Sequence, residues 1–139
     1  MKYNAVTKET LKAFFDQEFP NNTLQIESVG DKKARIRRVP AKADLRPGNT
    51  VSGPFMMSLV DTALYVAILG ELGLVALAVT TSLNFNFLRK PVANADVIAK
   101  CQLIKVGRQL VVGEVTLYSE GDDKPIAHAV GTYSLPSSS

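Results

Sequence analysis

Asp61 stands inside the most apolar stretch of the chain, residues 54–80. Burying an ionised carboxylate without partners is costly, so this side chain must be paired, hydrogen-bonded or placed at a cleft. One interpretation is a general base or nucleophile in an apolar setting. The other is a carboxylate that only caps a helix or joins a structural network. The residue type and its surroundings leave both open.

The segment PGNTVSGP, residues 47–54, leads directly into this apolar stretch. Ser52 or Gly53 is predicted as the N-cap of a helix, and Pro54 suits its first position because the N–H that proline lacks has no intrahelical partner there. Backbone N–H groups at a helix start attract negative charge. They can hold a carbonyl oxygen that becomes an oxyanion during a reaction. The alternative is that this glycine-rich loop only turns the chain.

Three further groups carry polar chemistry at predicted strand ends. Hydroxyls at Thr80-Thr81-Ser82 could orient a water molecule, although Thr and Ser also simply suit strands. The basic pair Arg89-Lys90 and the turn with Gly107 and Arg108 could bind phosphates through charge-assisted hydrogen bonds. The alternative for each pair is a solvated charge at a turn.

Metal chemistry is not expected. The chain has one cysteine, Cys101, and one histidine, His128. This pair is too small for a His/Cys zinc site, and a single cysteine cannot form an internal disulfide. His128 lies on the last predicted strand, away from the groups above, and is interpreted as structural.

The elements that must position these groups follow from periodicity. Residues 7–18 predict an amphipathic helix that ends before Pro20, and residues 23–29 and 33–39 predict a hairpin around Gly30-Asp31. Residues 40–53 are predicted as loop. The apolar helix is predicted over roughly 54–70, ended by Gly70 or Gly73. Long strands at hairpin spacing are then predicted over residues 77–89, 95–105, 110–118 and 125–134.

One apolar helix and one antiparallel sheet have an economical arrangement, in which the sheet curls around the helix. The predicted class is therefore α+β. Such a sheet keeps free edges, which symmetric dimers commonly satisfy by pairing them.

Length and composition limit the number of domains and exclude several classes of protein. The 139 residues match one domain, residues 1–139, and 46% hydrophobic with 21% charged residues exclude global disorder. A net charge of +3 does not indicate a nucleic-acid-binding surface. Asp61 and Glu71 interrupt the apolar stretch and argue against a membrane span. The N-terminus has no secretory signal pattern, so we expect a cytoplasmic protein.

Several of these pieces together resemble one family. They are GPFMMSLVD at 53–61, TSLNFNFLRKP at 81–91, Gly107-Arg108, and AHAVGTY at 127–133. Over roughly residues 30–136 the chain is similar to the hotdog-fold acyl-CoA thioesterases, in particular to the subgroup similar to phenylacetic-acid-degradation thioesterases. The resemblance implies a long central helix wrapped by a curved antiparallel sheet of five to six strands, with a short N-terminal helix.

The resemblance also implies site roles. The family typically has His-Gly-Gly before the helix, where this chain has Ser52-Gly53-Pro54. Ser52 and Gly53 would then belong to the catalytic residues, and the backbone N–H of Gly53 would polarise the thioester carbonyl. Asp61, from the facing subunit, would activate water or attack, and Thr81 would position the water. Coenzyme A phosphates would fall near Arg89, Lys90, Gly107 and Arg108.

The implied reaction is hydrolysis of an acyl-CoA, with the coenzyme A moiety as part of the substrate and no separate cofactor. A homodimer at least, and a homotetramer by resemblance, is expected. Two alternatives stay open: a non-catalytic acyl-CoA or coenzyme A binder, which the missing histidine motivates, and a dehydratase of β-hydroxyacyl thioesters. The acyl pocket is expected to include Phe55, Met56, Met57, Leu59 and Tyr65.

Overall fold

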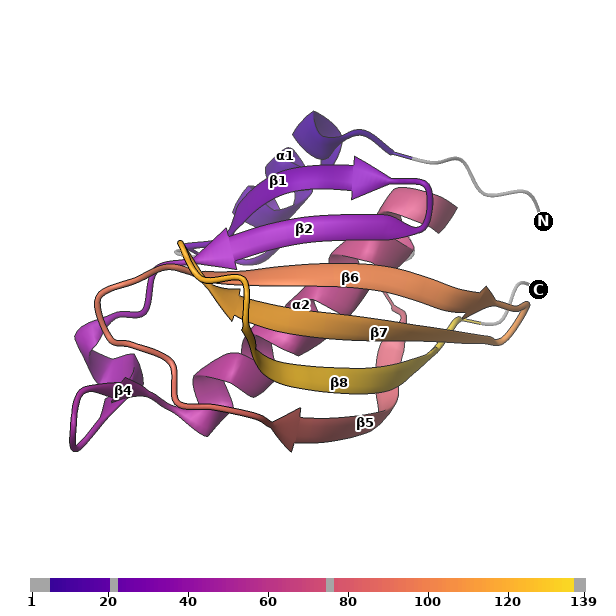
Figure 1. Ribbon diagram of the computed structural model, residues 1–139. Helices are drawn as coiled ribbons and strands as arrows, with labels where there is room; N and C mark the ends of the chain where they lie inside the picture. Colours follow the sequence, from indigo (N-terminus) through magenta and orange to yellow (C-terminus); the bar gives the residue numbers. More distant parts are fainter. Residues whose placement is uncertain (1–5, 21–22, 75–76, 137–139) are drawn as a thin grey trace.

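A computed structural model describes residues 6–20, 23–74 and 77–136. A six-stranded antiparallel sheet, in the order β1-β2-β6-β7-β8-β5, packs against the long helix α2, and the short helix α1 lies beside β1 and α2 (Figure 1). The α+β class, the central helix and the six strands confirm the prediction. The elements are α1 (Lys8–Glu18), β1 (Gln25–Gly30), β2 (Lys33–Arg38), a 3-10 turn (Lys42–Asp44), β3 (Leu45–Arg46), β4 (Thr50–Val51), α2 (Gly53–Leu72), β5 (Val79–Phe87), β6 (Val97–Val106), β7 (Leu110–Ser119) and β8 (Pro125–Ser134).

The described residues before residue 40 form much as their sequence predicts, and residues 40–53 differ. Thr7 caps α1 by accepting a hydrogen bond from the Thr10 N–H at 3.2 Å. The β1–β2 hairpin closes through Asp31 and Lys32, both with positive φ, one residue later than expected. Residues 40–53 are not simply loop, because they contain the 3-10 turn and the small β3–β4 hairpin. These elements are too short to show a hydrophobic period.

Helix α2 is the core of the molecule. It is apolar on most of its faces, and most of its residues are buried, consistent with a core helix. Gly73, at φ 95°, ends it, whereas Gly70 lies inside the helix. A Cβ at Gly70 would stand 2.2 Å from a Val29 side-chain carbon, so this glycine lets α2 approach β1.

Two paired glycines set the approach of the sheet to α2. Gly113 on β7 lies opposite Gly131 on β8, and a Cβ on either would stand within 2.7 Å of a Leu64 side-chain carbon. The sheet therefore has a hollow that receives Leu64. Close packing of this kind leaves no room for even one added carbon.

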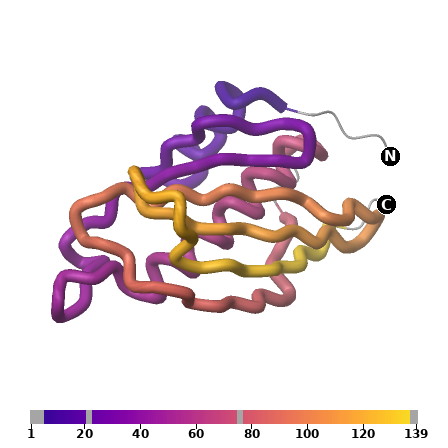
Figure 2. Tube along the Cα trace, viewed as in Figure 1, coloured from indigo at the N-terminus to yellow at the C-terminus, as the bar shows by residue number. Residues whose placement is uncertain are grey.

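One prediction about the strands is wrong. β5 and β6 are consecutive along the chain but not neighbours, because β5 pairs with β8 at the edge of the sheet. The connecting residues 88–96 cross the end of the sheet and are held by a bridge between Thr50 and Val92. Figure 2 shows this connection beside the 40–52 segment at one end of the sheet. Three inter-strand spacings, about 14 Å, are well within reach of nine residues.

Candidate active site

The start of α2 carries one free hydrogen-bond donor. Ser52 caps the helix: its Oγ accepts from the Phe55 N–H at 3.2 Å, and its carbonyl accepts from the Met56 N–H at 3.3 Å. Pro54 has no N–H. No described residue accepts a hydrogen bond from the Gly53 N–H. Gly53 therefore presents the single backbone donor at this helix tip, where the helix dipole favours negative charge.

A cavity of about 680 Å³ opens at this donor, and we call it the helix-tip cavity. Of the described residues, three with a positive charge and none with a carboxylate line it. The backbone N–H groups of Leu88 and Arg89 both donate to the Ile126 carbonyl, at 2.9 and 3.2 Å, which anchors the chain that carries the last two cations. The lining residues are Arg46, Pro47, Thr50, Val51, Gly53, Pro54, Met56, Met57, Phe87, Leu88, Arg89, Lys90 and Pro91.

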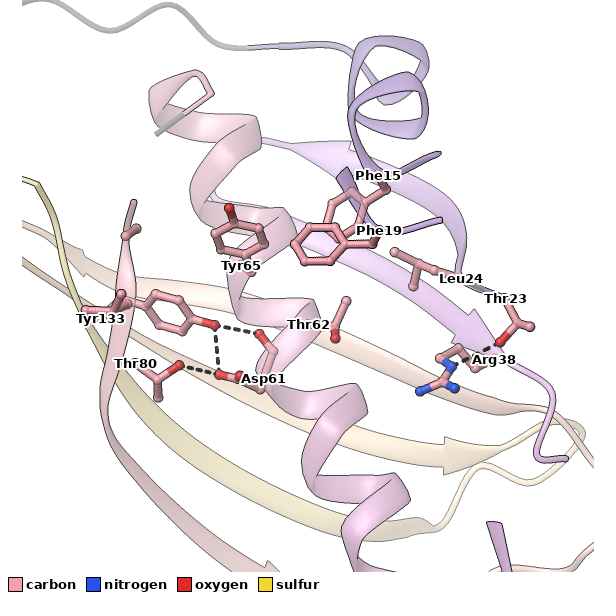
Figure 3. A pocket seen from close by; sticks show the side chains of 12 residues that line it. Phe15, Phe19, Thr23, Leu24, Arg38, Asp61, Thr62, Tyr65, Thr80 and Tyr133 are labelled. Carbon is pink, nitrogen blue, oxygen red and sulfur yellow. Dashed lines mark hydrogen bonds between the residues drawn. The ribbon is translucent and has the colours of Figure 1, made fainter. Parts of the chain in front are cut away.

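A second cavity, of about 570 Å³, opens at Asp61, and we call it the carboxylate cavity. Its lining residues come from α1, the start of β1, the end of β2, the middle of α2, the start of β5 and the end of β8 (Figure 3). They are Phe15, Phe19, Thr23, Leu24, Arg38, Asp61, Thr62, Tyr65, Ala78, Val79, Thr80 and Tyr133.

The Asp61 carboxylate is held on one side only. Its Oδ1 accepts from the Thr80 hydroxyl at 2.6 Å and lies 2.7 Å from the Tyr133 hydroxyl (Figure 3). No described residue donates to Oδ2. One oxygen is thus fixed by two hydroxyls, and the other remains available to a water molecule or a substrate atom. Such an arrangement suits a general base or a nucleophile.

Tyr133 is suited to donate to this carboxylate at any working pH. Burial raises the pKa of its phenol well above the usual value, and the hydrogen bond to Asp61 adds to the rise although the Thr80 hydroxyl opposes it. The hydroxyl therefore keeps its proton. It also lies 3.0 Å from the Asp61 backbone carbonyl.

A bulge in β5 decides which threonine reaches Asp61. Thr80 pairs with Tyr133 and Ser82 with Thr132, so Thr81 is the extra residue between them. The Thr81 hydroxyl donates to the Thr132 carbonyl at 3.2 Å, whereas Thr80 reaches the carboxylate. The sequence singled out this run of hydroxyls but not Thr80 and Tyr133 as the partners of Asp61, since the bulge gives no signal in the residue types.

The aromatic wall of the carboxylate cavity also escaped the sequence analysis. Tyr65 stacks on Tyr133 with ring centroids 6.2 Å apart and meets Phe15 edge-on at 5.9 Å. Phe19 extends the wall from the end of α1. The amphipathic pattern identified α1 as a helix, but it could not tell which cavity its phenylalanines line. Of the expected acyl-pocket residues only Tyr65 lines this cavity; Met56 and Met57 line the helix-tip cavity, and Phe55 and Leu59 line neither.

Some predicted site residues lie elsewhere. Gly107 and Arg108 form the β6–β7 turn, which the strand directions place at the opposite end of the sheet from Arg89 and Lys90 (Figure 1). Strands of this length separate the two ends by about 30 Å. Ser52 acts as a helix cap and does not line the helix-tip cavity.

The remaining reactive side chains are in structural positions. The His128 ring lies 3.2 Å from Glu114 across the β7–β8 pair, as its structural interpretation suggested. Cys101 is buried, and burial raises the pKa of its thiol to about 12, so it is not a ready nucleophile. Across residues 6–20, 23–74 and 77–136, no group of three or more His, Cys, Asp or Glu side chains is placed to hold a metal ion.

Comparison with known proteins places these features in a family. Residues 48–126 match the model of the thioesterase superfamily. The fold superposes with a TM-score of 0.87 on a protein from Silicibacter sp. that is named as a candidate thioesterase; it is 36% identical, over 99% of this chain and 96% of that one. None of the curated proteins matches the chain.

Two more distant structures share the fold. The PaaI protein of the Escherichia coli phenylacetic acid degradation operon is 21% identical, over 93% of this chain and 92% of that one, with a TM-score of 0.79. A hypothetical thioesterase of Streptococcus pneumoniae, solved with coenzyme A, is 18% identical, over 91% of this chain and 96% of that one, with a TM-score of 0.75.

Proposed function

The chain belongs to the thioesterase superfamily, and we propose that it hydrolyses an acyl-CoA thioester to a free acid and coenzyme A. The observation that carries the proposal is the way in which the Asp61 carboxylate is hydrogen-bonded. Its Oδ1 is held by two hydroxyls, and its Oδ2 is left free beside an apolar cavity. The same helix presents the free Gly53 N–H at its start.

One protomer is not sufficient for this reaction. Gly53 and Asp61 lie eight residues apart on one helix, which corresponds to about 12 Å along its axis. They also line different cavities. Because a water held by Asp61 must touch the carbonyl carbon held by Gly53, the two groups of one site come from two copies of the chain.

The free edge of β5 is the surface best suited to a second copy. β5 has β8 on one side and no described strand on the other. Its side chains Val79 and Phe87 are 57% and 53% exposed, and Met57 nearby on α2 is 42% exposed. An unpaired strand edge with exposed apolar side chains at both of its ends favours association. A homodimer through β5 is therefore part of the proposal, and a homotetramer stays a prediction.

The helix-tip cavity supplies the coenzyme A end of the site. Arg46, Arg89 and Lys90 line it without a carboxylate, which suits the phosphates of coenzyme A. The Streptococcus pneumoniae protein that shares the fold was solved with coenzyme A, which supports coenzyme A as part of the ligand. Gly107 and Arg108 would contribute only if another copy of the chain brought their turn to this cavity.

In the proposed reaction the thioester carbonyl accepts a hydrogen bond from the Gly53 N–H of one protomer. Asp61 of the other protomer takes a proton from water through Oδ2, and the hydroxide adds to the carbonyl carbon. The resulting oxyanion is stabilised by the Gly53 N–H and the helix dipole. The carbon–sulfur bond then breaks, and the thiolate takes up the proton to leave as coenzyme A. Thr81 as the residue that orients the water stays a prediction.

The test is thiol release from a panel of acyl-CoA thioesters, with the wild type and Asp61→Asn. We expect turnover by the wild type and a loss on the order of 100- to 10,000-fold in kcat for Asp61→Asn, with an unchanged melting temperature. Asp123→Asn, in the exposed β7–β8 turn, is the matched control. Equal turnover by Asp61→Asn would remove the aspartate from the mechanism.

A non-catalytic acyl-CoA binder is the second candidate, because Pro54 leaves the helix tip with one N–H donor only. Tight binding of acyl-CoA without thiol release would favour it. A dehydratase is disfavoured because the one histidine, His128, pairs with Glu114 away from both cavities. The cytoplasmic location stays a prediction.

A further inference from the structure

Three arginines on β2 differ in what they contact. Arg35 and Arg37 alternate with Ala34 and Ile36, which are buried, so the two arginines lie on the outer face of the sheet. Both are neutralised there by Glu27, at 2.6 and 2.7 Å. Arg37 also reaches two further carboxylates at 2.9 Å, those of Asp96 and Glu120.

Among the described residues, Arg38 has no carboxylate partner of this kind. Alternation places it on the inner face with Ile36, toward α2, and it lines the carboxylate cavity. Its Nε donates to the Thr23 hydroxyl at 3.2 Å, and its guanidinium carbon lies 4.8 Å from the centroid of the Phe55 ring. No described carboxylate oxygen lies within 4.0 Å of it. The guanidinium is thus held in place through Nε, and no described residue accepts a hydrogen bond from its two terminal nitrogens.

The position of this cation within the cavity indicates what it binds. Figure 3 shows Arg38 and Asp61 on opposite sides of the cavity, with the rings of Phe15, Phe19 and Tyr65 along one wall. A ligand that spans the cavity therefore meets a carboxylate at one end, an apolar body in the middle and a half-buried guanidinium at the other end. An unneutralised guanidinium favours a planar anion that accepts two parallel hydrogen bonds.

We propose that the carboxylate cavity accepts an acyl group with an apolar body and a terminal carboxylate, and that Arg38 binds this carboxylate. The inference rests on the proposed function, because it takes the thioester carbon to lie beside Asp61. The phosphates of coenzyme A fit the helix-tip cavity better than Arg38. That cavity has three cations, and they are not behind a wall of aromatic rings such as the one beside Arg38.

Two substrates that differ only at the far end test the inference. Hexanoyl-CoA and adipoyl-CoA have acyl chains of six carbons, and only adipoyl-CoA has a terminal carboxylate. We expect the wild type to favour adipoyl-CoA in kcat/KM by at least about tenfold, the effect of a charge-assisted hydrogen bond. Arg38→Gln should lower the adipoyl-to-hexanoyl ratio by about 10- to 100-fold. Arg35→Gln, on the outer face of the same strand, should leave the ratio unchanged.

The outcomes separate the alternatives. A wild type without preference for adipoyl-CoA overturns the inference, and so does an Arg38→Gln variant that raises KM for both thioesters equally, since Arg38 would then bind the coenzyme A moiety. If Arg38→Gln does not fold, Arg38→Lys decides: it keeps a charge but not the planar fork, and a ratio equal to that of the wild type contradicts the proposal.

Failure of the proposed function gives a different result. If neither thioester is hydrolysed by the wild type, the hydrolase proposal fails. The dissociation constants of the two thioesters are then measured by calorimetry on the wild type and on Arg38→Gln. If Arg38 binds the terminal carboxylate, the preference for adipoyl-CoA over hexanoyl-CoA falls in the variant.

Discussion

The two cavities along α2 differ in what each lacks. The helix-tip cavity has a free N–H and three cations but no carboxylate, whereas the carboxylate cavity has Asp61 and an aromatic wall but no backbone donor from a helix start. Each holds one half of the groups that the proposed hydrolysis uses. In that proposal the catalytic unit is therefore a pair of chains, in which the tip of one helix faces the middle of another.

Removing the Gly53 N–H tests most directly whether the helix-tip cavity supplies the oxyanion donor. Gly53→Pro deletes the N–H and adds a ring whose Cβ would lie 3.4 Å from a Phe87 ring carbon, and proline is well tolerated at the first helical position. The Ser52 backbone, at φ −71° and ψ 154°, already has the conformation that precedes a proline. We expect a loss in kcat on the order of 100- to 1000-fold. Gly53→Ala keeps the N–H and is the control; a Gly53→Pro enzyme within tenfold of it would contradict the donor role.

Mixing two inactive variants tests whether the halves come from different chains. In a heterodimer of Asp61→Asn and Gly53→Pro, one of the two sites has both intact groups. Random exchange of subunits should restore about a quarter of wild-type turnover. The measurement is thiol release after the two variants are unfolded and refolded together. Activity that stays at the level of the separate variants would place both groups in one protomer.

The hydroxyls around Asp61 should have a smaller effect than the carboxylate itself. Tyr133→Phe removes one of the two donors to Oδ1 and leaves Thr80 in place. We expect kcat to fall about tenfold with little change in KM, because the carboxylate is less well oriented. Tyr118→Phe, on the outer face of the sheet, is the matched control, because it removes a phenolic hydroxyl away from both cavities. A KM effect without a kcat effect would assign Tyr133 to substrate binding instead.

The cations of the helix-tip cavity should affect substrate binding more than chemistry. Arg89→Ala is expected to raise KM for acyl-CoA thioesters about fivefold and to change kcat less. Arg108→Ala, at the far end of the sheet, should raise KM only if another copy of the chain brings its turn to this cavity. Steady-state kinetics of both variants therefore reports on the assembly as well as on the cavity. An unchanged KM for Arg89→Ala would argue against phosphate binding there.

Charges outside both cavities should change stability and leave activity intact. Burial opposes ionisation of Glu27, but the hydrogen bonds from Arg35 and Arg37 outweigh it and lower its pKa. Because the folded-state pKa lies below the unfolded value, the stabilisation is present above the unfolded pKa and is lost as pH falls through the folded one. Glu27→Gln should cost about 1 kcal/mol at pH 7 and progressively less in acid. Denaturant unfolding at several pH values checks this; a constant difference would contradict it.

The strong local patterns were sufficient to predict most elements. The caps at Thr7 and Ser52, the apolar period of α2 and the alternation of the long strands each depend on neighbours along the chain. Asp61 also stood out, because a carboxylate in an apolar helix requires a partner wherever the helix packs. The pairing of β5 with β8 was missed, since short connections favour neighbouring strands and do not determine them.

Residue types and their spacing were sufficient for the α+β class and for the helix with its acid, and they indicated N–H groups at its start. That Gly53 is the free one follows from the hydrogen bonds of Ser52. The packed structure was needed to show that Thr80 and Tyr133 hold this acid and that α1 supplies an aromatic wall. It was also needed to show that Arg38 faces inward with no carboxylate partner among the described residues. The difference comes from separation along the chain: helix caps and hydrophobic periodicity depend on residues only a few positions apart. Hydrogen bonds across a bulged sheet edge and the wall of a cavity join segments that are distant in the chain, and the packing of the whole molecule sets their distances.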